Sequence, residues 1–190
     1  RVTGTPLFEN EGARMIHLGL AGTYQYGNNV SEDFKERPES NLAKAYLDTG
    51  DFERDGRSTV GLEAAWVHDS FSLQSEYMGT YLNSTYLQGA YLEASYYLTG
   101  EHRVYNRKMG TFTNRVHPHD KKWGAWQIAS RVSYINLNGN DIRGGKELNF
   151  TAGVNWYYRK NLKVAFNYVH GNVNNGDAIN IAQMRTQIIF

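Results

Sequence analysis

The sequence of 190 residues contains no cysteine and only three prolines. The absence of cysteine excludes a disulfide-bonded scaffold and any metal site built on thiolates. No run of eighteen or more apolar residues occurs, which excludes a membrane-spanning helix. The 20 Lys and Arg residues nearly balance the 19 Asp and Glu residues, so overall charge does not indicate a nucleic-acid partner.

Tyrosine and glycine are abundant instead, with 14 and 19 residues, and apolar side chains recur at every second position. This period of two predicts β-strands, and no segment shows a competing helical period. The pattern predicts about nine strands of roughly ten residues, a length that crosses a bilayer at a tilt. The expected strands are 15–26, 39–48 (with no assignable faces), 60–67, 71–78, 91–98, 126–134, 148–158, 162–168 and 179–190.

Polar and glycine-rich stretches between these strands predict two kinds of connection. The short turns 68–70 and 159–161 fall on the side of the C-terminus by strand parity. Longer loops are expected mainly on the other side, an asymmetry that outer-membrane barrels show. The expected loops are 1–14, 48–56, 100–122, 138–145 and 172–177, of which 100–122 lies on the short-turn side.

Most expected strands have one nearly apolar face, while the opposite face carries charged residues in mid-strand. A soluble β-sandwich also has a polar face and remains an alternative. Aromatic residues near the strand ends favour an all-β, antiparallel transmembrane β-barrel, whose outer wall meets lipid. The aromatic residues expected to form one belt are Tyr24, Tyr26, Trp66, Phe71, Tyr96, Trp156, Tyr158 and Phe190.

An odd number of strands cannot close an ordinary bacterial barrel, and an open sheet edge cannot face lipid. We therefore expect residues 1–190 to be the C-terminal portion of a single barrel domain, with further strands preceding Arg1.

Several short motifs, in order along the chain, resemble one known family. They are RPES at 37–40, LDTG at 47–50, VGLEAAW at 60–66, FSLQSEYM at 71–78, GAYLEASYYLTGE at 89–101, WGAW at 123–126, NDIRGG at 140–145, VNWY at 154–157 and NYVH at 167–170. From about residue 15 to 190 the chain resembles the phosphate-selective porins O and P. The resemblance implies a sixteen-stranded, trimeric porin of the bacterial outer membrane that conducts anions such as phosphate or polyphosphate. It also implies that an inward-folded loop and much of the basic lining belong to the N-terminal half.

A pore selects ions by the charges along its lining. Strand parity places Arg131, Lys163 and Arg185 on the inward face of late strands, with Arg159 at the short-turn end of the same wall. Arginine offers a planar fork that suits phosphate oxygens, and lysine offers a point charge. These cations are candidate anion-binding residues, although pairing with acids of the lining, or solvation of a wall that must be polar, would also explain each one.

Three acids, Glu63, Glu76 and Glu93, are also expected inside, on neighbouring strands where like charges repel. The segment 102–122 is strongly basic. We hypothesise that it folds inward, pairs with these glutamates and narrows the exit; a solvated basic loop is the alternative. Its candidate pore residues are Arg103, Arg107 and Arg115.

No nucleophile motif or phosphate loop is present, so the chain is not expected to be an enzyme. His117 and His119 are separated by one proline and lack a third ligand, so we expect neither metal nor cofactor. The expected partners are membrane lipid and lipopolysaccharide, small anions such as phosphate and two further copies in a homotrimer, without nucleic acid. The alternative functions are a barrel acting as a structural or interaction partner in an envelope complex, with little or no conductance, and a soluble β-sandwich binding module.

Overall fold

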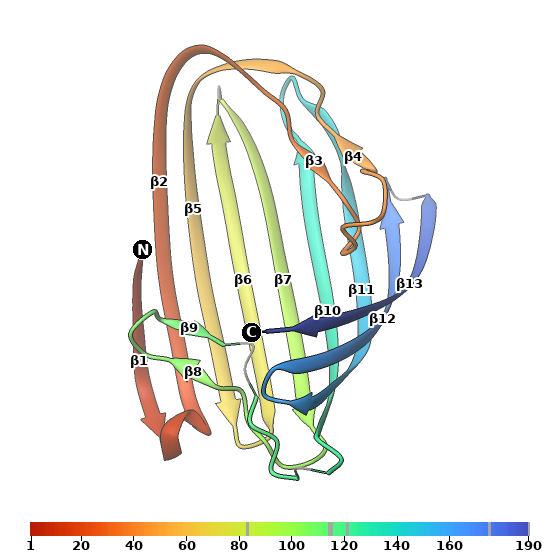
Figure 1. The fold of residues 1–190 in the computed structure, drawn as a ribbon. Helices are drawn as coiled ribbons and strands as arrows, with labels where there is room; N and C mark the ends of the chain where they lie inside the picture. The colour runs from red at the N-terminus through yellow and green to blue at the C-terminus, as the bar shows by residue number, and fades with distance from the viewer. Residues whose placement is uncertain (83, 114–115, 121, 175, 190) are drawn as a thin grey trace.

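The computed structural model describes residues 1–82, 84–113, 116–120, 122–174 and 176–189. Nine antiparallel strands form one curved sheet in the order β1-β2-β5-β6-β7-β10-β11-β12-β13, and two small hairpins, β3–β4 and β8–β9, lie on its concave side (Figure 1). Their bounds are β1 Val2–Glu9, β2 Arg14–Glu32, β3 Lys35–Glu36, β4 Leu47–Asp48, β5 Phe52–His68, β6 Phe71–Leu82, β7 Thr85–Tyr97, β8 Tyr105–Asn106, β9 Thr111–Phe112, β10 Ala125–Asn138, β11 Arg143–Arg159, β12 Leu162–Val173 and β13 Asp177–Ile188, with a 3-10 turn at Asn10–Gly12. No helix of the described residues is long and apolar enough to cross a membrane.

The all-β, antiparallel prediction is confirmed, and the nine long strands form a single open sheet. Each strand of the main sheet pairs with its neighbours along the chain, because every connection is a hairpin or a longer excursion that returns to the adjacent position. Apolar residues at alternate positions, such as Leu20, Leu62 and Val132, are half exposed on the convex face. Residues between them point to the concave face, as the period of two predicts.

Two strand predictions were wrong. Residues 1–14, expected as a loop, contain β1, which pairs with β2. Pro6 lies where the register shifts between Gly4 and Leu7, and such an irregularity accommodates a residue that has no N–H to donate. Residues 39–48, expected as a strand of the sheet, contribute only the two residues of β4, which pair with β3 inside the loop 33–51.

The loop boundaries also differ from those expected. β2 continues to Glu32 and β5 begins at Phe52, because their pairing resumes beyond an irregularity between Tyr26 and Val30. The predicted loop 48–56 is therefore half strand. The turns at 69–70 and 160–161 lie at one end, as predicted, but the β6–β7 connection at the opposite end is also short.

The convex aromatic residues form two belts rather than one. Near the short turns, Trp66 packs edge-on against Phe71 with ring centroids 5.8 Å apart, and Trp126 stacks on Trp156 at 5.6 Å. Tyr24 and Tyr26 lie towards the other end, where they pair with Ser58 and Gly56. Phe190 lies outside the described residues. Two belts separated by apolar wall match the two interfaces of a bilayer.

The buried residues lie on the concave side in three separate clusters. The largest is aliphatic and anchors the loop 33–51 by Leu47, whose side chain is fully buried. A second holds Val116 among Tyr97, Ala125 and Tyr157. The third joins Tyr105 to the sheet. The clusters thus attach the two inward segments, 33–51 and 98–124, to the wall. The members of the largest cluster are Leu47, Leu82, Leu87, Leu137, Ile142, Val173 and Ile179.

Candidate functional site

A pocket of about 250 Å³ lies on the concave face against β10, β11 and β12. Three cations line it, Arg103, Arg131 and Lys163, together with two carboxylates, Glu39 and Glu93. All three cations were candidates from the sequence, and the fold brings them together although Arg103 and Lys163 are 60 positions apart. The pocket is the candidate functional site.

Strand register explains why two of these cations point inward. Arg131 on β10 lies opposite Glu93 on β7 and Thr151 on β11. Lys163 on β12 lies opposite Tyr157. Side chains of directly opposed residues share a face, so the charged rows of these strands meet on the concave side. Arg103 reaches the pocket from the segment 98–124.

Each pocket cation lies over an aromatic ring. The guanidinium carbon of Arg131 is 3.7 Å from the ring centre of Tyr91, and that of Arg103 is 4.0 Å from the ring centre of Phe112. The Lys163 Nζ atom is 4.9 Å from the ring centre of Tyr157. Distances below about 6 Å are favourable for a cation over an aromatic face.

Glu39 joins the loop 33–51 to the pocket. Arg131 Nη1 donates to Glu39 Oε2 at 3.3 Å, and Gln183 Nε2 on β13 donates to the Glu39 backbone carbonyl at 3.1 Å. The ion pair is partly exposed, with 30% and 21% of the two side chains accessible, so solvent screens it. The loop therefore reduces the charge of Arg131 only in part.

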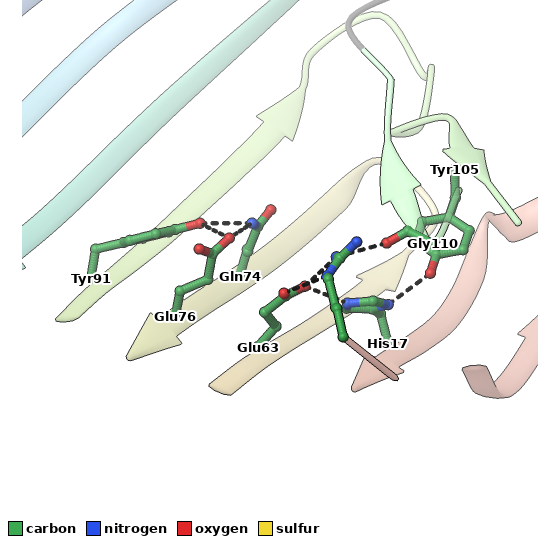
Figure 2. A network of polar contacts seen from close by, with 8 residues as sticks. His17, Glu63, Gln74, Glu76, Tyr91, Tyr105 and Gly110 are labelled. Atoms are coloured by element: carbon green, nitrogen blue, oxygen red, sulfur yellow. Dashed lines mark hydrogen bonds and ion pairs between the residues drawn. The ribbon is translucent and has the colours of Figure 1, made fainter. Parts of the chain in front are cut away.

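A polar network attaches the β8–β9 hairpin to the wall (Figure 2). Glu63 accepts two hydrogen bonds from Arg1, at 2.8 and 2.5 Å, and its Oε2 lies 3.2 Å from His17 Nε2. The other ring nitrogen of His17 lies 2.7 Å from the Tyr105 hydroxyl, and Arg1 donates to the carbonyl oxygen of Gly110 at 3.0 Å. Burial raises the pKa of Tyr105, so its hydroxyl keeps its proton at neutral pH.

Glu76 lies directly opposite Glu63 on the wall and is held by neutral donors. Its Oε1 accepts a hydrogen bond from the Tyr91 hydroxyl at 2.6 Å and another from Gln74 Nε2 at 3.0 Å (Figure 2). Tyr91 therefore has contacts of two kinds. Its ring supports Arg131, while its hydroxyl donates to Glu76 and accepts a hydrogen bond from Gln74 Nε2 at 2.7 Å.

The segment 102–122 lies on the concave side as expected, but its described residues form no ion pair with Glu63, Glu76 or Glu93. Whether the segment narrows the exit stays a prediction. The β8–β9 hairpin lies on the concave side, and Arg103 lines a second pocket of about 210 Å³ with Glu63 and Glu76. The ion pairs of Glu63 are with Arg1 and His17, both outside that segment. Glu63 is thus neutralised within the wall, because β1, which was expected to be loop, brings Arg1 beside it.

Three of the remaining candidate cations, Arg107, Arg159 and Arg185, are described and do not line the pocket. Arg185 is exposed on β13, opposite Ala165. Arg159, at the end of β11, lies 5.2 Å from the ring centre of Tyr158, and Arg107 lies 4.7 Å from that of Phe8. Arg115 lies outside the described residues.

Sequence reasoning missed the aromatic rings and Glu39. Tyr91 and Tyr157 stand at inward positions of their strands, so parity could have placed them beside Arg131 and Lys163. Phe112 and Glu39 come from the inward segments, whose paths no periodic pattern indicates.

Comparison with known proteins adds to this geometry. Residues 4–190 match the family described as phosphate-selective porin O and P. The chain is 30% identical over 181 residues to Porin O of Pseudomonas aeruginosa, an alignment that covers 84% of this chain. It spans 40% of the length of that relative.

Proposed function

The chain belongs to the phosphate-selective porin O and P family of bacterial outer-membrane proteins, and from this premise we propose that it forms part of the wall of a water-filled channel that prefers anions, phosphate among them. Family membership points to a channel rather than to an enzyme.

The observation that carries the proposal is the meeting of Arg103, Arg131 and Lys163 in one pocket on the concave face. Three cations face two carboxylates there, so the pocket has a net positive charge. Arginine N–H groups suit two phosphate oxygens at once, and a nearby ammonium adds attraction without fixing geometry. An anion entering the concave side would exchange part of its hydration shell for these donors.

The convex face supports the membrane side of the proposal. Its half-exposed aliphatic wall between two aromatic belts suits contact with lipid chains. Lipopolysaccharide would contact the belt that contains Tyr24 and Tyr26, at the end away from the short turns. The nine strands would form one continuous part of a single barrel domain, the C-terminal portion as expected from the sequence. A homotrimer is proposed from the family alone, and no nucleic-acid partner is proposed.

A second candidate function is a structural or interaction partner with little conductance. The observation that favours it is the pair of inward segments, 33–51 and 98–124, which both lie against the concave face. Together they occupy part of the space through which ions would pass.

The test is ion selectivity of the full-length protein in a planar bilayer, with phosphate added as a blocker of chloride current. We expect anion preference and block by phosphate. Arg131→Gln and Lys163→Gln should each weaken the block, and Arg185→Gln should weaken it less because Arg185 does not line the pocket.

Lys122→Gln is the matched control, since Lys122 is exposed over Trp123 and does not line the pocket. A wild-type channel without anion selectivity would mean that these cations are general wall residues. An equal loss of phosphate block in Lys122→Gln and in the pocket variants would mean the same. A protein that inserts but carries no current would favour the partner function.

A further inference from the structure

Aromatic rings support all three cations of the pocket, and Arg131 pairs with the Glu39 carboxylate as well. Phe112, Tyr91 and Tyr157 lie under Arg103, Arg131 and Lys163 respectively. Within the described part of the chain, neither Arg103 nor Lys163 has a carboxylate oxygen within 4.0 Å.

The two kinds of support have opposite effects on a passing anion. A carboxylate holds a cation by neutralising it, so less of the positive charge acts on a ligand. An aromatic ring attracts a cation through its quadrupole and has no net charge. A guanidinium that lies flat on a ring still has its in-plane N–H groups free to donate. Rings can therefore fix the position of a cation and leave its charge available.

Phe112 shows this arrangement most simply. Its ring meets that of Tyr105 edge-on, with centroids 5.2 Å apart and planes at 73°. Tyr105 in turn contacts His17 on β2 through its hydroxyl. A chain of contacts thus runs from the wall through Tyr105 and Phe112 to Arg103, which lines both the cation pocket and the neighbouring pocket of Glu63.

The other two rings belong to tyrosines whose hydroxyls also form hydrogen bonds. Tyr91 donates to Glu76, and the Tyr157 hydroxyl donates to Gln127 Oε1 at 3.1 Å. Changing either tyrosine would disturb a hydrogen bond as well as a cation. Phe112 has no polar atom in its side chain, so it isolates the effect of the ring.

We propose that Phe112 is a positioning residue that sets the strength of oxyanion binding in this channel by holding Arg103 over the pocket without neutralising it. The inference rests on the proposed function of the pocket. It adds that the affinity for phosphate-type anions depends on an uncharged side chain that does not itself touch the anion.

The experiment measures the phosphate concentration that halves the chloride current through the full-length protein in planar bilayers. Phe112→Leu keeps an apolar side chain and changes no charge. It is expected to raise the half-blocking concentration about fivefold, the loss of one cation–ring contact. Phe112→Tyr keeps the ring and is expected to restore wild-type block.

Phe8→Leu is the matched control, because Phe8 lies under Arg107 and packs near the same Tyr105 ring, with centroids 6.4 Å apart. Arg107 does not line the pocket, so phosphate should block this variant at the same concentration as the wild type. Phe112→Leu in an Arg103→Gln background should add no further loss. Heat-modifiable gel mobility reports whether each variant is folded.

The proposal is overturned if phosphate blocks the current through Phe112→Leu at the same concentration as through the wild type. It is also overturned if Phe8→Leu raises the half-blocking phosphate concentration as much as Phe112→Leu does. A third contrary result is a further rise on adding Phe112→Leu to Arg103→Gln. A wild-type channel without anion preference would instead refute the proposed function, and that result is separate because it needs no variant.

Discussion

The two inward segments of the concave face are held by different forces. The loop 33–51 is anchored by aliphatic packing around Leu47, whose side chain is fully buried. The segment 98–124 is anchored by aromatic and polar contacts, chiefly Tyr105 with His17 and the carbonyl oxygen of Gly110 with Arg1. The loop 33–51 is attached mainly by aliphatic burial, whereas the segment 98–124 combines burial of Val116 and Tyr105 with contacts that depend on direction.

This difference suggests different tasks. Aliphatic packing is strong and non-directional, so it fixes a segment in place without specifying the orientation of its polar groups. Hydrogen bonds and ring contacts are weaker singly but define orientation. The loop 33–51 is thus held to the concave face chiefly by packing, and the segment 98–124 is the part that brings a cation, Arg103, to the pocket.

The largest expected effect comes from removing the aliphatic anchor. Leu47→Ala should cost about 2–5 kcal/mol of packing free energy, the usual range for a buried leucine. We expect the loop 33–51 to leave the wall, and trypsin to cleave after Lys44 in the folded protein.

Leu42→Ala is the control on the same loop, since Leu42 is 96% exposed and should leave cleavage unchanged. Equal protection of the loop in both variants would show that Leu47 is not its anchor.

A smaller effect is expected from the polar attachment of the other segment. Tyr105→Phe removes the hydroxyl that contacts His17 and should cost about 1 kcal/mol, the usual contribution of one hydrogen bond. Cleavage after Arg107 and Lys108 should become faster by a factor of about five. Tyr24→Phe, on the exposed convex face, should not change it. No difference between these two variants would mean that ring packing alone holds the hairpin.

The smallest change in stability is expected at the ion pair between the loop and the pocket. Glu39→Gln should alter unfolding free energy by no more than about 1 kcal/mol, because the pair is partly exposed. Phosphate block should nevertheless strengthen, since Arg131 loses its carboxylate partner. Glu36→Gln, on β3, removes the same charge without touching Arg131. An equal gain in both variants would indicate a general charge effect rather than release of Arg131.

Strand parity predicted much of the wall and of the site. The alternation placed Arg131 and Lys163 on the concave face and Leu62 and Val132 on the convex face, because a regular strand leaves each residue only two directions. The clustering of Arg103 with them could not be predicted, since it depends on the path of a segment with little regular structure.

Other features were beyond sequence reasoning for reasons that are equally physical. β1 was not predicted, because Pro6 and the register shift beside it interrupt the alternation on which a strand prediction relies. The prediction of a wall strand at residues 39–48 is wrong because Leu47 packs into the aliphatic cluster on the concave face, which places that stretch inside the sheet. Glu39 and Arg131 are 92 positions apart, a separation at which no local pattern predicts a contact.

The strictly sequential order of the strands has a consequence for how such a chain can change in evolution. Gain or loss of one whole hairpin returns the chain to the same end of the sheet, so every later strand keeps its direction and every later connection keeps its side. Gain or loss of a single strand would reverse them all. Duplication or deletion of a two-strand unit is therefore the step by which this wall can be lengthened or shortened while its membrane orientation is preserved.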